Sequence, residues 1–588
     1  MRYLVIILLL MGAFAGVWYF SAGAGPEVDF TYCNGGIIGT LDPAAMSWHQ
    51  DIHMALNVWE GLYAYDPRTI LAVPASSFPA EISDDRCTYT FSLRPEARWS
   101  NGDLLTAEDF VYGWRRAMEP GTARDYAFFF EMIEGVREYV AWRLAETERI
   151  GGIADAGQKR AARDTHLAEA DRRFAQTVGI RAEDEKTLSI RLTRPVAYFL
   201  DLCAFATFLP VHRESIHPYK IVGDTGLIYY DEQWVKPGNT HYNGPFKMTE
   251  WKFKQHILLE KNPLYWNRSA VRLNRVMERQ VEDGNTAWLL YSGGQLDWLS
   301  TVRTVYAPTL VTDSSSPFEI SLNKHGTRRN DIHAHSAFGT YFYNFNCRPT
   351  LPDGRPNPFV DPRVRRAFTM AVDKQSLVDQ VIRLGNPVAT AFVPPETIPG
   401  YPEVAGLPYD PSMARALLAE AGFPEGRGFP EVVILYNTGF DHGLVAEAII
   451  GMWSRTLGVT GRIEGKEGKT FLDDKKNARY IIARAGWFGD YNDPTTFLEM
   501  FKTDNGNNDS KFSDPVYDRM LEEADPRLDE GERLAALADV ERYLVEEALP
   551  LLPLYNYVYV EAFDPDRVRN LHISPRQMSP LWPIEVLE

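Results

Sequence analysis

The residues best placed for chemistry belong to a strand-to-helix connection near residue 490. Residues 478–485 are apolar enough for a buried strand, and Asp493 followed by Pro494 is typical of a helix start. Residues 484–492 therefore lie where a strand ends close to a helix, and open α/β sheets bind ligands at such strand ends. Asp490 could bind a cationic group there, or it could only stabilise the helix through its dipole. Asp493 fits the second role better because it directly precedes Pro494.

Other candidate motifs fail on inspection, so no catalytic residue, metal or cofactor is expected. Residues 461–470 resemble a phosphate-binding loop, but Ile463 stands where the first glycine is required. Neither H-E-x-x-H nor G-x-S-x-G occurs. His333 and His335 lie in a polar stretch without an acidic or Cys partner at ligand spacing, and we expect surface histidines. Residues 504–509 offer oxygens for calcium but carry Gly at the third ligand position, which favours a plain loop.

The charge of the chain narrows the class of partner. The 588 residues contain 61 Lys and Arg against 79 Asp and Glu, a formal net charge of −18. This balance opposes nucleic-acid binding, which needs a basic surface against phosphates. It fits a neutral or cationic ligand, or a local patch on another protein. The length predicts two or three domains.

The N-terminal segment predicts export from the cytoplasm. Residues 4–20 contain no charged side chain, and the small residues 21–24 that follow are typical of a signal-peptidase site. The alternative is an uncleaved membrane anchor, because the apolar stretch is only just long enough to span a bilayer. Lipidation is not expected, since the first cysteine, Cys33, comes too late. The four cysteines (33, 87, 203 and 347) match no zinc pattern, and their pairing stays open.

Beyond the N-terminus, the pattern predicts an α/β protein with at least two lobes. Thr106 and Asp109 have capping-box spacing at the start of a helix. Residues 137–175 are rich in Ala, Arg and Glu and predict a helical excursion that is broken near Gly151. From residue 340 onward strands and helices alternate, and Asp361-Pro362 and Asp410-Pro411 are each typical of a helix start.

Several segments then resemble the periplasmic oligopeptide-binding proteins of ABC peptide importers, which belong to the bacterial extracellular solute-binding proteins of family 5. The most discriminating of them contains Trp487 and Asp490. The resemblance implies a two-lobed periplasmic-binding-protein fold of the large peptide- or nickel-binding type, with three domains and a ligand cleft between the lobes. The segments are residues 99–114, 243–251, 261–267, 361–368 and 483–497.

The resemblance also implies a domain division in which domain I is discontinuous. Two chain segments are expected to cross between the lobes. The predicted ranges are 1–25 for the signal peptide or anchor; 26–62, 196–338 and 553–588 for domain I; 63–195 for domain II with the excursion near 137–175; and 339–552 for domain III.

By resemblance, Asp490 receives the α-amino group of a bound peptide. The backbone of Gly486, Trp487 and Phe488 would pair with an extended ligand, and such bonds are blind to ligand side chains. Trp487 could line a side-chain pocket or simply pack in the core. Further predicted ligand-binding residues, of which the first three are cations for ligand carboxylates, are Arg484, His442, Lys475, Asn437 and Tyr126.

Four positions depart from the family pattern. Lys475 stands where the best-known relative has Arg, which replaces a bidentate group by a point charge. That relative also has two cysteines at the positions of Gly339 and Phe488, and both are absent here. At Trp48 an acidic residue is expected near the start of the ligand, so recognition of the amino group would depend more on Asp490.

The resemblance implies an exported, non-enzymatic protein that captures short peptides and delivers them to ABC transporter permease subunits. We expect a monomer that lies in the periplasm or on the extracytoplasmic face of the membrane, contacting the membrane through the transporter and through residues 4–20 if these stay uncleaved. The alternatives are a murein-peptide receptor, a sensor or chaperone adaptor that uses the same cleft, and a peptidase.

Overall fold

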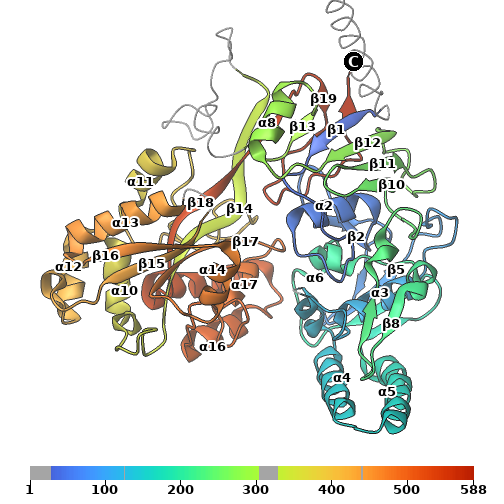
Figure 1. The fold of residues 1–588 in the computed structure, drawn as a ribbon, viewed down its shortest axis with the longest axis horizontal. Helices are drawn as coiled ribbons and strands as arrows, with labels where there is room; N and C mark the ends of the chain where they lie inside the picture. The colour runs from blue at the N-terminus through green and yellow to red at the C-terminus, as the bar shows by residue number, and fades with distance from the viewer. Residues whose placement is uncertain (1–27, 125, 303–328, 439–441, 588) are drawn as a thin grey trace, which may run out of the picture.

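The protein has two lobes that are joined by long strands (Figure 1). This computed structural model describes residues 28–124, 126–302, 329–438 and 442–587. The predicted signal peptide or anchor at residues 1–25 lies outside them. Within the described residues, no helix is both long enough and apolar enough to cross a bilayer.

One mixed sheet of ten strands runs through both lobes. Two of these strands, β14 (Ile332–Phe345) and β18 (Leu551–Phe563), pair antiparallel from Ile332↔Ala562 to Asn344↔Leu551 and form its centre. Both run without interruption across the predicted boundaries at 338/339 and 552/553, so these strands are the segments that cross between the lobes. In spatial order the other strands are β10 (Phe246–Lys252), β11 (His256–Lys261), β12 (Arg275–Arg279), β1 (Phe30–Cys33) and β13 (Trp298–Leu299) on one side, and β17 (Ile482–Phe488), β15 (Val432–Asn437) and β16 (Gly461–Lys466) on the other.

The first lobe adds a separate four-stranded antiparallel sheet. Its strands are β4 (Glu81–Ile82), β5 (Thr88–Ser92), β7 (Thr187–Arg191) and β6 (Ile180–Ala182). Three short two-stranded pairs are β2 (Tyr63–Tyr65) with β3 (Ala72–Pro74), β8 (Lys220–Val222) with β9 (Ile228–Tyr230), and β19 (Val568–Arg569) with β20 (Glu585–Val586). The helices of this lobe are α2 (His49–Val58), α3 (Ala107–Met118), α4 (Val136–Gly151), α5 (Ala156–Thr177), α6 (Phe199–Leu202), α7 (Arg213–Ile216) and α8 (Gly284–Ser292).

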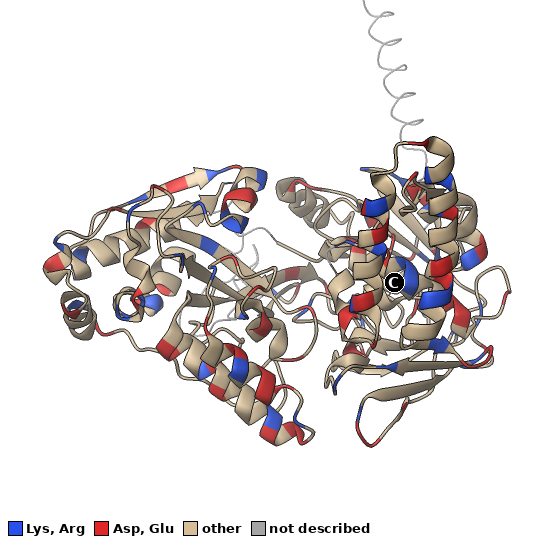
Figure 2. Cartoon of the chain, turned by 90° about the horizontal axis from the view of Figure 1, so that it is seen from below, with Lys and Arg blue, Asp and Glu red and all other residues tan. Residues whose placement is uncertain are grey.

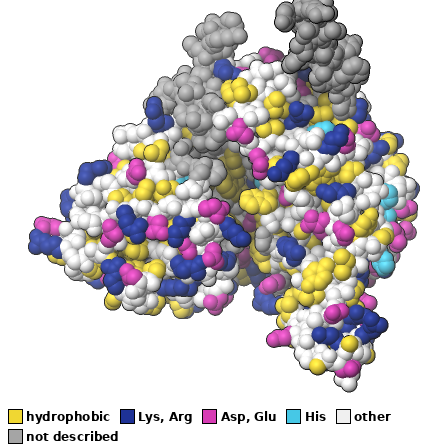
Figure 3. Space-filling model, in the orientation of Figure 1, with side chains coloured by type: hydrophobic (Ala, Val, Ile, Leu, Met, Phe, Trp, Pro, Cys, Tyr) yellow, Lys and Arg dark blue, Asp and Glu magenta, His cyan; other side chains and the backbone are white. Residues whose placement is uncertain are grey.

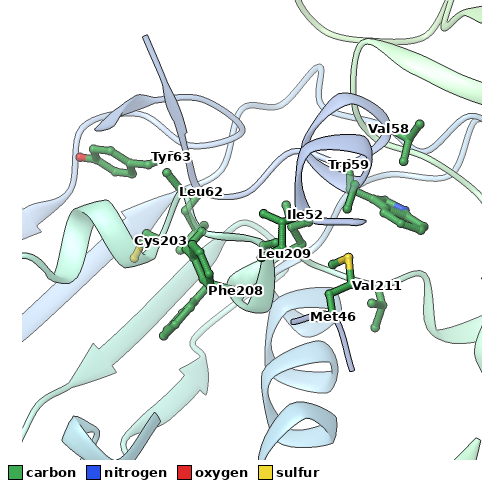
Figure 4. Packing of buried hydrophobic residues seen from close by; sticks show 14 of the residues in the cluster. Met46, Ile52, Val58, Trp59, Leu62, Tyr63, Cys203, Phe208, Leu209 and Val211 are labelled. Carbon is green, nitrogen blue, oxygen red and sulfur yellow. The ribbon is translucent and has the colours of Figure 1, made fainter. Parts of the chain in front are cut away.

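Local signals in this lobe are confirmed by the structure. Thr106 and Asp109 form the predicted capping box at the start of α3. The predicted excursion is the hairpin of α4 and α5, which projects from the lobe (Figure 1). One hydrophobic core joins residues 46–63 to residues 203–211, and Figure 4 labels residues of both segments, among them Ile52 and Leu209. Phe91, Trp99 and Trp114 of the predicted domain II belong to the same core, so the predicted domains I and II share it.

The second lobe contains strands β15, β16 and β17 and the helices α10 to α17. Asp361 and Asp410 cap α10 and α12 with their side chains, and Pro362 and Pro411 follow directly, as the sequence predicts. Among the described residues, this lobe contains two large hydrophobic cores and one small one. Its helices are α10 (Pro362–Met370), α11 (Lys374–Leu377), α12 (Pro411–Glu420), α13 (His442–Leu457), α14 (Gly468–Lys476), α15 (Thr495–Leu498), α16 (Pro515–Ala524) and α17 (Glu530–Arg542).

The structure corrects the prediction for His333 and His335 and shows the state of the four cysteines. His333 and His335 are not surface histidines of a polar loop, because both lie on the central strand β14 and are partly buried. His335 also has an acidic neighbour, since its Nε2 lies 3.1 Å from Glu561 Oε1.

Within the described residues, no three His, Cys, Asp or Glu side chains are arranged to hold a metal ion. The four cysteines, all of which are described, are free thiols.

Acidic and basic side chains are interspersed along the surface helices of both lobes (Figure 2). The surface between the lobes is hollowed, and hydrophobic side chains lie inside the hollow (Figure 3). The end of β17 and the loop that follows it lead into the region where the two lobes meet.

Candidate functional site

Asp490 lies just beyond β17, where the second lobe meets the first. Its Oδ1 accepts a hydrogen bond of 3.1 Å from the hydroxyl of Tyr126, a residue of the first lobe. Its backbone N–H donates to Thr496 Oγ1 at 3.0 Å, which fixes the loop. Burial raises the pKa of Asp490 to about 6, while the hydrogen bond from Tyr126 and the charge of Arg576 act in the opposite direction. The ionised form of such a buried carboxyl group is stabilised by any cationic group that can reach it.

A buried ion pair supports the Asp490 loop from behind. The guanidinium of Arg576 donates to Asp201 at 3.1 Å and also to the backbone carbonyl of Asp490. The backbone N–H of Asn492 donates to Asp201 Oδ2 at 3.1 Å. Asp201 therefore neutralises the charge of Arg576. The carboxylate of Asp490 can then interact with Tyr126 and with a ligand.

Asp493 has the structural role that its position before Pro494 predicts. Its Oδ1 accepts the backbone N–H of Thr495 at 3.0 Å, at the start of α15. Its carboxylate also forms a buried ion pair with Arg533 at 2.6 Å. The helix-end role that the sequence offered for a carboxylate in this loop therefore belongs to Asp493, and the role of Asp490 as the receptor for a cationic group stays a prediction.

β17 presents a free backbone edge next to Asp490. On one side, Gly486, Trp487 and Phe488 pair antiparallel with residues 339–341 of β14. On the other side, among the described strands, β15 pairs only with Ile482 and Ala483. The edge from residue 484 onward is therefore open to an added strand, the recognition mode that the sequence predicts for this segment.

The two faces of β17 differ in chemistry because side chains alternate along a strand. Trp487 faces the core of the second lobe, and its indole N–H donates to the carbonyl of Thr496 at 2.7 Å. Core packing, the alternative role for Trp487, therefore accounts for these contacts, and its role as a pocket wall stays a prediction. Phe488 points to the other face, stacks on Tyr557 at 4.6 Å between ring centroids, and is 41% exposed.

Arg484 lies on the same face as Phe488 and is surrounded by tyrosines. Its Nη2 donates to Tyr557 Oη at 2.8 Å, and its guanidinium lies 4.9 Å from the centroid of the Tyr341 ring. Its Nη1 lies 3.5 Å from Asn437 Oδ1, so the predicted partner Asn437 is beside it. Its Nε has no hydrogen-bond partner, and in the described part of the chain no carboxylate forms an ion pair with it. This buried cation is suited to a ligand carboxylate.

His442 reaches the same cluster but not as a cation. It begins α13, and its Nδ1 lies 3.3 Å from Tyr341 Oη. Burial and the charge of Arg484 lower its pKa to about 3. The sequence analysis expected a positively charged group at this position, and the structure corrects this: near neutral pH the imidazole is uncharged and can offer a ligand one hydrogen bond.

Lys475 also differs from the expectation. It lies in the last turn of α14, and its Nζ forms an ion pair of 3.1 Å with Asp509. Its charge is therefore compensated within the second lobe. Its role as a receptor for the carboxylate of a ligand stays a prediction, and a ligand would have to compete with Asp509.

Sequence reasoning missed several residues of the site, above all Tyr341, Tyr557 and Arg576. A signal for the tyrosines was present, because residues 555, 557 and 559 of β18 are all Tyr and must share one face of the sheet. Their proximity to Arg484 depends on strand order, in which β14 separates β18 from β17. Nothing in the sequence near Arg576 indicates its contact with the loop at Asp490.

Comparison with known proteins places the chain in a family. Residues 54–509 match the family described as bacterial extracellular solute-binding proteins, family 5 Middle. The oligopeptide-binding protein OppA of Bacillus subtilis is 30% identical over 491 residues, covering 81% of this chain and 78% of that protein.

Two solved structures extend the likeness to the fold. A periplasmic oligopeptide-binding protein of an oligopeptide ABC transporter from Borrelia burgdorferi superposes with a TM-score of 0.73 at 26% identity, covering 95% of this chain and 100% of that one. The murein tripeptide binding protein MppA of Escherichia coli gives 0.73 at 25% identity, covering 96% and 99%. The chain therefore belongs to the family 5 bacterial extracellular solute-binding proteins.

Proposed function

We propose that this protein is an extracytoplasmic receptor that binds short peptides between its lobes and delivers them to an ABC importer. The observation that carries the proposal is the arrangement along one strand. An open backbone edge at residues 486–488 lies between the carboxylate of Asp490 and the uncompensated cation of Arg484.

This arrangement matches the charges of a zwitterionic peptide. The ammonium group of the ligand would pair with Asp490, its backbone would add to β17, and its carboxylate would meet Arg484. The ligand would then run antiparallel to β17, with its N-terminus near the loop. Six residues separate the two charged groups, which is at most about 20 Å of extended chain. A peptide of a few residues suits this span.

The relatives support the class of ligand and the partner. The Bacillus subtilis protein is named for oligopeptides, and the Borrelia burgdorferi structure for an oligopeptide ABC transporter. The similarity to a murein tripeptide binding protein supports a second candidate ligand, a cell-wall peptide with a free amino group. Both ligands would use Asp490 in the same way.

The proposal also covers the location and state of the protein. We infer that it acts as a monomer outside the cytoplasm, that it reaches the membrane through the transporter, and that it performs no chemistry on the peptide. The binding-protein family supports this reading.

The test is mass spectrometry of ligands that co-purify with the exported protein, followed by titration calorimetry with the peptides identified. Linear peptides of a few residues with free termini are expected, and recovery of muropeptides would favour the second candidate. Incubation with the same peptides should leave them intact. Cleavage products in stoichiometric excess over the protein would overturn the receptor proposal in favour of a peptidase.

A further inference from the structure

A second cavity lies in the first lobe, away from the candidate peptide site. Its volume is about 560 Å³, within the range of sites that hold small molecules. The walls come from one face of α3, the C-terminal part of α5, β6, α7 and the β8–β9 pair. None of the residues assigned above to the peptide site lines it.

The inner wall of the cavity is aromatic. Tyr112 and Tyr230 lie side by side, with their hydroxyl oxygens 3.2 Å apart, and Phe174 of α5 adds a third ring. Arginines cover part of these rings: the guanidinium of Arg115 lies 4.9 Å from the centroid of Phe174, and that of Arg213 lies 5.7 Å from that of Tyr112. Aromatic and cationic surfaces therefore alternate around one space.

The positive charges in this cavity are not all compensated. Arg115 is paired with Asp171 at 2.7 Å, and Arg116 with the buried Asp42. Arg213 and Lys220, by contrast, form no ion pair within the described part of the chain. Both side chains are exposed to solvent. Partial burial lowers the pKa of Lys220, with Arg115 and Arg213 acting in the same direction and Asp171 and Glu119 in the opposite one. An anion placed between Lys220 and Arg213 would offset this cost.

Acidic side chains in the wall of the cavity limit the kind of anion. Glu108 lies one turn before Tyr112 on α3, about 6 Å along the helix axis. Glu183 of the segment after β6 also lines the cavity and has no ion pair among the described residues. A polyanion that filled the cavity would meet these carboxylates. A ligand with one anionic group and an uncharged body avoids them.

We propose that this cavity is a second ligand site, which binds a small aromatic anion: a ring that carries a single carboxylate or phosphate group. The anionic group lies between Arg213 and Lys220, and the ring packs against Tyr112, Tyr230 and Phe174. Because α5 supplies Phe174 and Asp171, the projecting α4–α5 hairpin forms one wall of the site.

Titration calorimetry in a phosphate-free buffer with phenyl phosphate, benzoate and inorganic phosphate tests this proposal. The wild-type protein is expected to bind phenyl phosphate or benzoate more tightly than inorganic phosphate, because the ring contributes contacts. The aromatic anion that binds more tightly shows whether the site prefers a phosphate ester or a carboxylate. The double variant Arg213→Gln/Lys220→Gln should bind the preferred probe at least tenfold more weakly. Its single variants provide the same test if the double variant does not fold.

Two matched controls locate the binding. Arg268→Gln/Arg519→Gln removes two exposed cations that form no ion pair in the described chain and do not line the cavity, and it should leave probe binding unchanged. Arg484→Gln removes the cation of the peptide site and should also leave it unchanged. The proposal is overturned if the wild type binds none of the aromatic probes, if the cavity variants bind them equally well, or if Arg484→Gln abolishes binding. These outcomes are independent of whether peptides bind between the lobes.

Discussion

The hydroxyl of Tyr126 donates a hydrogen bond of 3.1 Å to Oδ1 of Asp490, although the two residues belong to different lobes. A second contact joins the same two segments, because Phe129 packs edge-on against Tyr491 with ring centroids 5.7 Å apart. The carboxylate that is proposed to receive the amino group of a peptide is therefore shared between the lobes. A ligand that binds Asp490 thereby interacts with the contact that joins them.

Replacing Tyr126 by Phe removes this one hydrogen bond and keeps the ring. The bond lowers the pKa of Asp490, so its loss should raise that pKa further above about 6. Peptide binding at pH 7 should weaken by at most about 1.5–3 kcal/mol, the usual contribution of a hydrogen bond to a charged group. Calorimetry of Tyr126→Phe measures this. Tyr229→Phe, an exposed tyrosine outside the site, serves as the control and should bind as the wild type does. Unchanged affinity of Tyr126→Phe would remove Tyr126 from the site.

Asp490→Asn tests the amine receptor directly. If Asp490 pairs with a desolvated ammonium group, the variant should bind free peptides more weakly by about 2–5 kcal/mol. Acetylation of the peptide N-terminus should cause a similar loss with the wild type, because it removes the same charge. The two changes together should cost clearly less than their sum, since both remove one interaction. Four calorimetric titrations give this cycle. Equal binding of free and acetylated peptides by the wild type would contradict the assignment.

The pH dependence of binding follows from the raised pKa of Asp490. In the ligand-free protein this carboxyl is half protonated near pH 6, whereas an ammonium group requires its ionised form. Affinity for free peptides should therefore be highest near pH 7, and it should fall as the pH is lowered through 6, by at most about tenfold per pH unit for one proton. It should also fall above about pH 8, where the α-amino group of the peptide loses its proton. The acetylated peptide should lack this dependence. A flat profile for free peptides between pH 7 and pH 4.5 would show that Asp490 does not titrate with binding.

The sequence predicted the residues of the Asp490 loop because they are neighbours in the chain. Pro494 marks the start of α15, and this places Asp490 at a strand end before any tertiary contact is known. The strand itself was placed too early: residues 478–485 were expected, and β17 spans Ile482–Phe488. One local and one long-range feature explain this difference in the bounds of the strand. Ala478 has a φ of +52°, which is incompatible with a strand, while pairing with β14 carries the strand through Gly486.

Charge states in the site could not be predicted from the sequence. His442 is neutral because Arg484, 42 positions later in the chain, lies near it in a buried cluster. Lys475 is compensated because a loop brings Asp509 to 3.1 Å. In both cases the charge of the site residue depends on a side chain from another element, which the local sequence does not reveal. The domain division and the individual binding roles remain predictions.

Gly486→Ala tests the close approach of β17 to Tyr557. A Cβ at this position would lie 2.3 Å from Tyr557 Oη, so the tyrosine must move and its hydrogen bond to Arg484 must break. Urea unfolding should show a loss of stability of about 1–3 kcal/mol, the usual cost of overpacking. Adding Tyr557→Phe removes the clashing hydroxyl and should recover part of the loss. Gly468→Ala is the control, because a Cβ there meets nothing within 4 Å. A full loss in the double variant would indicate that the ring carbons of residue 557, at 3.2 and 3.3 Å from the added Cβ, cause the clash.

Arg484→Gln tests whether the cation in the tyrosine cluster receives the carboxylate of the ligand. The wild type holds this charge buried without a carboxylate partner among the described residues, and the Nε of Arg484 has no hydrogen bond. A ligand carboxylate would neutralise this charge and accept a hydrogen bond from Nε. The variant should therefore bind peptides with a free C-terminus more weakly, by about 2–5 kcal/mol. Amidation of the peptide C-terminus should weaken binding to the wild type and have little further effect on the variant.

The same variant separates the binding role of Arg484 from a structural one. Because Arg484 forms no ion pair in the described chain, the variant should lower the free energy of unfolding of the ligand-free protein by no more than about 3 kcal/mol, the upper value for its charged hydrogen bond to Tyr557. Thermal unfolding without peptide measures this, and Arg479→Gln, whose exposed side chain is paired with Asp474, is the matched control. A variant that is strongly destabilised without ligand, yet binds free and amidated peptides with the same ratio as the wild type, would show that Arg484 supports the fold and that the carboxylate of the ligand lies elsewhere.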